Sequence, residues 1–141
     1  MRDVSRCCLV ALLALAACED RSYRAIGGAI DMLTKRNHEL PGPAIERLRT
    51  IGRPAVPQIE TAMHTASTRG KVNLIAALAA IGEPESATIL QHFAVYDANA
   101  EVRTACEELL AKWAAASDGR TEPAKRAIAR IAEKRRLGQA E

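Results

Sequence analysis

The sequence predicts an all-α chain, built as a short α-solenoid of antiparallel helix pairs with a capping helix at each end. Apolar residues recur three and four positions apart, as in Ile75, Leu78 and Ile81, and β-branched runs of the strand type are absent. Glycine and proline stand between these periodic segments, where helices end and begin. The whole pattern returns after about 30 residues, which is typical of stacked helix pairs.

The N-terminal segment, residues 1–17, has the pattern of a secretory signal peptide. Arg2 and Arg6 precede an uncharged run over residues 7–17. This run is about half of the ~20 apolar residues that a membrane-spanning helix needs, so we expect it to be removed by cleavage. The alternative is that the same run forms a buried core helix.

The segment Leu15-Ala16-Ala17-Cys18 resembles the lipobox of bacterial lipoproteins. The resemblance implies that Cys18 becomes the mature N-terminus, that its thiol receives a diacylglycerol, and that its new amino group is acylated. Two or three acyl chains give stable anchoring, which a single chain does not. Residues 18–22 would then be the lipidated end and tether, held in the bacterial cell envelope; Glu19 and Asp20 leave the choice between inner and outer membrane open. The alternative is that Cys18 merely follows an ordinary signal peptide.

The folded part is expected over residues 23–137. A helix over residues 22–37 comes first and suits a polar cap. Three repeats follow, at about residues 43–66, 69–96 and 98–137. Superposing the first two keeps apolar residues and helix breakers in register: Ile45 on Ile75, Leu48 on Leu78, Ile51 on Ile81, Gly52 on Gly82, Pro54 on Pro84, Ile59 on Ile89 and Met63 on Phe93. Each repeat is therefore predicted to be a helix, a tight turn with glycine at the C-cap, and a second helix with proline in its first turn.

Three segments carry a family resemblance. Residues 51–59 read Ile-Gly-Arg-Pro-Ala-Val-Pro-Gln-Ile, residues 81–87 read Ile-Gly-Glu-Pro-Glu-Ser-Ala, and residues 97–105 read Asp-Ala-Asn-Ala-Glu-Val-Arg-Thr-Ala. They resemble HEAT-like repeats of the short bacterial type, also called phycobilisome-lyase-like repeats. The resemblance covers about residues 43–116, and it implies the helix-pair solenoid that the periodicity also predicts.

The chain departs from the family pattern at two places. Asn73 stands where the second repeat usually has arginine, and residues 112–114, Lys-Trp-Ala, stand where Gly-x-Pro is expected. We therefore expect the third repeat to have a longer first helix, a loop at residues 117–119 and a final helix over residues 122–137. Trp113 is expected to fill the interface between these two helices.

The resemblance implies that the second helix of each pair forms the binding face. If Val56, Ile59 and Met63 face the core, a polar and nearly uncharged stripe points away from it. Such a stripe suits a protein or peptide better than a phosphate backbone. The alternative is that these are ordinary solvated helix positions. The candidate binding residues are Gln58, Thr61, Thr65, Thr88, Gln91, His92 and Val95.

Positive charge is concentrated near the C-terminus, although the whole chain carries a formal charge of only +3. Such a helix could contact anionic headgroups or an acidic partner, at about 1 kcal/mol per basic residue near a charged surface. We prefer a solvated capping helix that docks on the third repeat through Ala127, Ile128 and Ile131. The candidate basic patch is Lys125, Arg126, Arg130, Lys134, Arg135 and Arg136.

The sequence carries no recognisable catalytic, phosphate-binding or cofactor motif. His38, His64 and His92 are not at metal-ligand spacing, so we expect no metal site. Cys106 falls on the expected core face beside Val102. A buried, inert thiol is therefore expected there, because a nucleophile needs a basic and partly exposed site.

Together these observations predict a non-catalytic protein–protein interaction scaffold or adaptor, lipid-anchored in the bacterial envelope, with no cofactor and no nucleic-acid partner. Its partner would be an unknown envelope protein or peptide. The alternative is a protein that binds a membrane surface or an anionic ligand through the basic C-terminal helix. HEAT-like lyases and glycosylases are weaker analogies. An exported protein does not encounter DNA, and the four aromatic residues are not expected to form a platform for stacking bases: Tyr23, Phe93, Tyr96 and Trp113.

Overall fold

The computed structural model describes residues 21–35 and 41–138. Over these ranges the secondary structure is helical and contains no strand, so the all-α prediction is confirmed. The signal peptide, Cys18 and the first part of the tether lie outside the described residues, as does His38. None of the described helices is both long enough and apolar enough to cross a bilayer.

The helices follow one another with short connections. Residues 21–34 form the first described helix and are followed, after the gap, by α2. The remaining elements are α2 (Gly42–Ile51), the 3₁₀ turn η1 (Arg53–Ala55), α3 (Val56–Thr65), α4 (Thr68–Ile81), α5 (Ser86–Tyr96), α6 (Ala100–Ala114) and α7 (Thr121–Gly138). The longer α6, the following loop and the final helix agree with the helices expected from the sequence.

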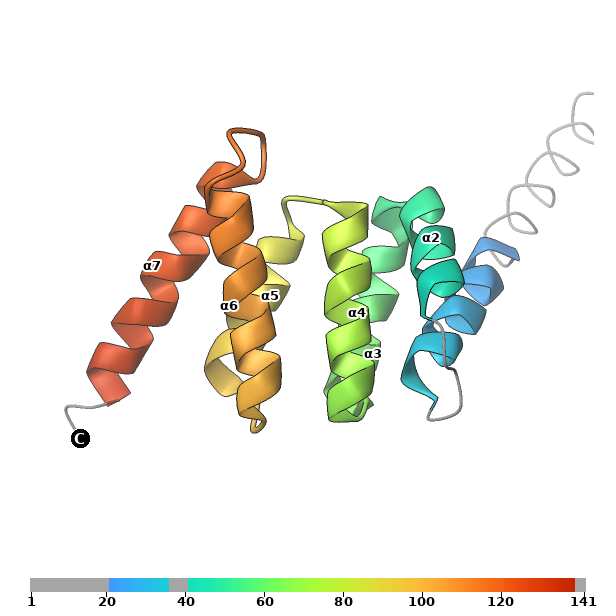
Figure 1. Ribbon diagram of the computed structural model, residues 1–141, viewed down its shortest axis with the longest axis horizontal. Helices are drawn as coiled ribbons and strands as arrows, with labels where there is room; N and C mark the ends of the chain where they lie inside the picture. The colour runs from blue at the N-terminus through green and yellow to red at the C-terminus, as the bar shows by residue number, and fades with distance from the viewer. Residues whose placement is uncertain (1–20, 36–40, 139–141) are drawn as a thin grey trace, which may run out of the picture.

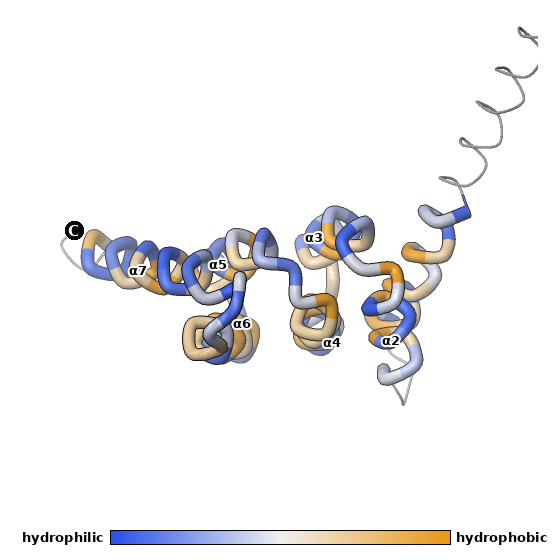
Figure 2. Tube along the Cα trace, turned by 90° about the horizontal axis from the view of Figure 1, so that it is seen from above, coloured by the Kyte–Doolittle hydropathy of each residue, from blue (hydrophilic) through white to orange (hydrophobic). Residues whose placement is uncertain are grey.

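The helices are stacked in chain order along the long axis of the molecule (Figure 1). Seen from above, they form two rows, with α2, α4 and α6 in one row and α3, α5 and α7 in the other (Figure 2). Within the first row α2 packs on α4 and α4 packs on α6, while α7 packs on both α5 and α6. Each neighbouring pair therefore buries its apolar faces against the next.

A single hydrophobic core runs between the two rows. Val56, Ile59 and Met63 on α3 are buried, as the helical period predicted, and Leu78 and Leu90 continue the core along α4 and α5. Each fully buried side chain of this size contributes about 1.5–3 kcal/mol relative to an exposed one. Because no single helix pair could bury its own apolar face, the stacking itself stabilises the fold.

The two glycine turns are built alike. Gly52 and Gly82 both end a helix with positive φ angles, 75° and 74°, and their N–H groups donate to Leu48 O and Leu78 O at 2.9 Å. The prolines differ from the prediction, because Pro54 lies in η1 and Pro84 lies in the turn before α5 rather than inside the next helix. A residue without an N–H donor fits these turns, where the ring also presets φ.

Asn73 connects α4 to the first described helix. Its side-chain Nδ2 donates to Leu33 O at 3.0 Å, at the end of the first described helix. On α6, Arg103 donates through Nη1 to Asp97 O at 2.8 Å and to Ala98 O at 3.0 Å, just after α5. In both helices the side chain therefore satisfies carbonyl groups at the end of another element.

The helices α6 and α7 close the C-terminal end of the stack. Trp113 is 1% exposed, as expected, and the Arg120 guanidinium lies 5.6 Å from the centre of its ring. The docking face of α7 consists of Ala124, Ala127 and Ile131, all buried. Ile128 does not belong to it and is 38% exposed, because one residue turns about 100° around the helix.

Candidate binding surface

The candidate binding residues fall on the outer faces of α3 and α5. Thr61, Thr65, Thr88 and His92 are exposed, whereas Gln58, Gln91 and Val95 are half-buried. The Thr61 hydroxyl donates to Pro57 O at 3.0 Å within its own helix. Thr88 and Gln91 line a different hollow from His92.

Thr88 and Gln91 line a furrow between α5 and α7. The opposite wall consists of Pro123, Arg126, Ala127 and Arg130, and the hollow between the walls has a volume of about 180 Å³. We call it the α5–α7 furrow. The structure therefore brings part of the predicted polar stripe and part of the predicted basic patch to one place, although the sequence placed them on separate surfaces.

The basic residues of α7 divide into paired and unpaired groups. Lys125 Nζ lies 3.2 Å from Glu122 Oε1, and the Arg135 guanidinium forms an ion pair with Glu107 of α6. Arg126 makes only a long 3.4 Å bond, from Nε to Glu122 O. Within the part of the chain that the structure describes, the remaining cations of α7 make no hydrogen bond or ion pair: Arg130, Lys134 and Arg136.

A second furrow separates α5 from α3 and contains an aromatic cluster. The ring centres of His64 and His92 are 5.8 Å apart, His64 lies 5.1 Å from Phe93, and His92 lies 5.1 Å from Tyr96. Sequence reasoning missed this cluster because it compared equivalent repeat positions, which point in the same direction. Residues that meet between neighbouring helices lie instead on opposite sides of their helices.

The floor of this second furrow is a buried ion pair. Lys71 Nζ lies 2.6 Å from Asp97 Oδ2, and the Asn99 N–H donates to Asp97 Oδ1 at 2.9 Å. Burial of the Asp97 carboxyl raises its pKa, but the bonds from Lys71 and Asn99 and the charges of Lys71 and Arg103 lower the pKa more, so it lies below its usual value. Lys71 also lies 5.7 Å from the centre of the Phe93 ring. These contacts fix the start of α4 to the end of α5.

The described part of the chain offers neither a cluster of metal ligands nor an exposed cysteine thiol. No group of three or more His, Cys, Asp or Glu residues there could hold a metal ion. Cys106 is fully buried and free, as expected. Burial, with the nearby charges of Asp97 and Glu107, raises the pKa of its thiol to about 12, so it stays protonated at neutral pH.

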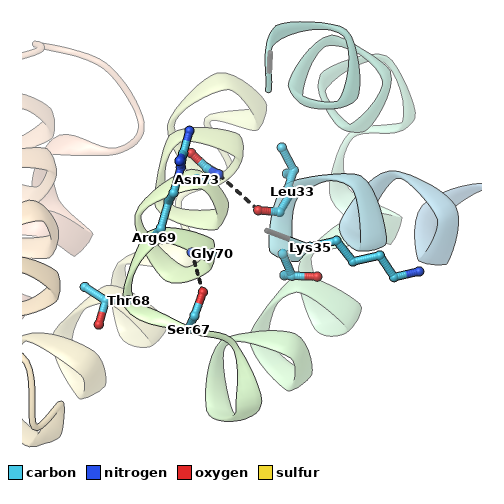
Figure 3. Close-up of a pocket in the computed structure, with 8 residues that line it drawn as sticks. Leu33, Lys35, Ser67, Thr68, Arg69, Gly70 and Asn73 are labelled. Carbon is cyan, nitrogen blue, oxygen red and sulfur yellow. Dashed lines mark hydrogen bonds between the residues drawn. The ribbon is translucent and has the colours of Figure 1, made fainter. Parts of the chain in front are cut away.

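A third hollow, of about 360 Å³, lies between the first described helix and the start of α4 (Figure 3). The side chains of Ser67 and Asn73 at this hollow are already used by the fold. Ser67 Oγ accepts from the Gly70 N–H at 3.3 Å as the N-cap of α4, and Asn73 holds Leu33 O. A Cβ atom at Gly70 would lie 3.3 Å from Thr34 Cα, so the two helices meet closely here. This region is a packing junction.

A comparison with known proteins finds no matching family model, no significantly similar curated protein and no significantly similar solved structure. The α5–α7 furrow and its unpaired cations are therefore the starting point for a functional argument.

Proposed function

We propose that this chain is a bacterial envelope lipoprotein whose folded part is a short HEAT-like α-solenoid that binds a protein partner without catalysing a reaction. The observation that carries this proposal is the α5–α7 furrow, where Thr88 and Gln91 face Arg126 and Arg130. Such a mixture of amide, hydroxyl and guanidinium donors is typical of a polar protein-binding surface.

The arrangement of the helices supports the solenoid interpretation. The helices alternate between two rows, and the glycine turns after α2 and α4 make equivalent hydrogen bonds. Asn73 and Arg103, which are equivalent in the repeat, both hold carbonyl groups of the preceding element. Stacked helix pairs present one row of helices as an extended surface, which is how repeat proteins bind other proteins.

The anchor is supported by the lipobox resemblance at Leu15-Ala16-Ala17-Cys18. Cys18→Ser should abolish labelling by a radioactive or alkyne fatty acid and should move the protein out of the membrane fraction, because the thiol that carries the diacylglycerol is gone. Cys8→Ser is the control, since it changes a cysteine of the same segment outside the lipobox and should leave labelling intact. Acylation that survives in Cys18→Ser would refute the anchor.

The partner is tested by site-specific photo-crosslinking in intact cells. A photoreactive residue at the exposed Thr88 should capture one distinct protein, whereas the same residue at Arg47, exposed on α2 in the other row, should not. Gln91→Glu should weaken the capture at Thr88, because it places an anion in a furrow lined by guanidinium groups. Equal capture from both rows would contradict a dedicated binding surface.

Membrane-surface binding is a second candidate function, because α7 exposes several cations over a mostly hydrophilic helix (Figure 2). It predicts that the full chain lacking the lipid, as Cys18→Ser, binds anionic vesicles. It also predicts that Arg136→Gln weakens this binding as much as Arg130→Gln does, because a flat bilayer reaches the outward face of α7 first.

A further inference from the structure

We infer that the α5–α7 furrow binds an extended acidic peptide segment of the partner, with carboxylates at every second residue. This inference rests on the proposed protein-binding function and adds the chemistry that the partner must present. It is argued from the distribution of charge on α7, from the spacing of its cations and from the donors on the opposite wall.

The charge of α7 is concentrated on the side that faces α5. Arg126 and Arg130 line the furrow, and Lys134 follows Arg130 by four residues, so all three project from one side of the helix. Glu122, four residues before Arg126, begins the same row, but it is paired with Lys125 and does not line the furrow.

The outward side of α7 carries charges of both signs. By helical periodicity it carries Lys125, Arg136, Glu122 and Glu133, with Arg126 at its edge, and Lys125 is already paired with Glu122. On the α6 side, Arg135 is paired with Glu107. The positive charge of Arg126, Arg130 and Lys134 therefore lies on the α5 side of the helix, where the first two line the furrow. A flat bilayer would first meet this face of mixed charge, so the distribution favours a thin acidic segment.

The spacing of the cations matches an extended chain. Residues four apart in an α-helix rise by about 6 Å, so Arg126, Arg130 and Lys134 form a ladder with steps of about 6 Å. Alternate side chains of an extended strand point to the same side and are about 7 Å apart. A segment with glutamate or aspartate at every second position can therefore place one carboxylate beside each cation. In a segment of contiguous acidic residues, every second carboxylate would point to the opposite side, away from α7.

The α5 wall supplies donors for the rest of the peptide. Gln91 is half-buried, and its amide makes no hydrogen bond within the described residues. The exposed Thr88 hydroxyl is likewise unused there. An amide and a hydroxyl at the edge of a furrow suit the peptide groups of an extended segment, whose backbone pairs with no strand of its own. A second copy of α7 would instead bring the same cations and be repelled.

The test uses the full chain in neutral detergent micelles and three fluorescent peptides of equal length. In the first, glutamate alternates with serine; the second holds the same residues with the glutamates contiguous; the third has glutamine in place of glutamate. Fluorescence anisotropy should show that the alternating peptide binds several times more tightly than the contiguous one and that the glutamine peptide does not bind. Equal affinity for the two acidic peptides would overturn the inferred register.

Substitutions then locate the site. Arg130→Gln should weaken binding of the alternating peptide about tenfold, because it removes a charge-assisted contact in the furrow. Lys112→Gln, an equal change of charge at an exposed position of α6, should change binding less than twofold. An equal loss in both variants would overturn the site, since it would show unspecific attraction, and so would strong binding to anionic vesicles without any peptide binding.

This inference and the proposed function fail in different ways. If photo-crosslinking at Thr88 still captures its partner in the Arg130→Gln background and no acidic peptide binds, the acidic-peptide site is overturned and the protein-binding function stands. If the alternating peptide binds as expected but Thr88 captures no protein in cells, the peptide site stands and the proposed partner function is overturned.

Discussion

At the scale of single residues, the Lys71–Asp97 pair is the most consequential polar contact that we find. Asp97 is 8% exposed, and its carboxylate joins the start of α4 to the turn between α5 and α6 through Lys71 and Asn99. Removing one partner of such a pair leaves the other charge desolvated and unpaired, which costs more than an exposed ion pair contributes.

We therefore expect Asp97→Ala to lower the free energy of unfolding by about 2–3 kcal/mol, measured by urea denaturation. The matched control is Asp31→Ala, which removes the exposed pair between Lys35 Nζ and Asp31 Oδ2 at 2.6 Å and should cost less than about 0.5 kcal/mol. Equal effects of the two substitutions would contradict the structural role of the buried pair.

The same carboxyl predicts a dependence on pH. Its pKa is lower in the folded chain than in the unfolded chain, so its contribution to stability is present above the unfolded value and is lost as the pH falls through the folded value. Below about pH 4 the wild-type protein should therefore lose stability faster than Asp97→Asn, which has no proton to bind there. If the free energy of unfolding fell equally with pH in the two proteins, ionisation of Asp97 would contribute nothing to stability.

The residue scale also shows what sequence reasoning can reach. Burial of Ile59 and Met63 followed from the helical period alone, and so did the burial of Cys106. The contact of His64 with His92 could not be predicted, because it depends on the distance and rotation between two neighbouring helices. Those quantities are set by packing across the whole core and leave no periodic signal in the chain.

At the scale of elements, the two glycine turns have equivalent positions but different backbone demands. Gly82 adopts φ 74° and ψ 17°, the left-handed helical region that asparagine also tolerates. Gly52 adopts φ 75° and ψ −142°, which lies far from that region and is open in practice only to glycine. The sequence pattern predicted a glycine C-cap at both positions. It could not distinguish the two backbone conformations, since the difference arises from the 3₁₀ turn that follows Gly52.

This difference predicts unequal tolerance to substitution. Gly82→Asn should cost less than about 1 kcal/mol of unfolding free energy, whereas Gly52→Asn should cost about 2 kcal/mol or more. Gly28→Ala is the control: the position is helical, exposed and without neighbours within 4 Å, so alanine should stabilise by about 0.5–1 kcal/mol. Thermal melts followed by circular dichroism would rank the three variants, and equal costs at Gly52 and Gly82 would contradict the assigned backbone geometry.

At the scale of the whole molecule, the stack is held together mainly by contacts between neighbours. The helices of the first row pack successively, and the described N-terminal helix is held to α4 by Asn73 and by its own buried residues, while α7 closes the other end. The order of helices was predictable because each carries its own period and breakers. That Gln91 and Arg130 line the same furrow was not predictable, because the distance between α5 and α7 depends on how α7 packs on both α5 and α6.

A chain stabilised mainly by contacts between neighbouring helices should unfold locally when one of these contacts is weakened. Asn73→Ala removes the hydrogen bond to Leu33 O and should loosen residues 21–34, with a cost of about 1 kcal/mol at that end. Trp113, the only tryptophan of the chain, lies in the α6–α7 junction and reports on the opposite end. In urea unfolding, the early part of the circular-dichroism curve should therefore shift to lower urea concentration, while the midpoint of the tryptophan fluorescence curve stays unchanged.

Arg103→Ala makes a similar change on α6, where the side chain donates hydrogen bonds to Asp97 O and Ala98 O. In this variant the fluorescence midpoint should fall together with the circular dichroism, because the loosened junction adjoins the helix that carries Trp113. Hydrogen exchange should show the same division, with protection lost first in residues 21–34 for Asn73→Ala and first around the α5–α6 turn for Arg103→Ala. Coincident shifts of both probes in both variants would instead mean that the described helices unfold as one cooperative unit, since a local loss would then be transmitted through the entire core.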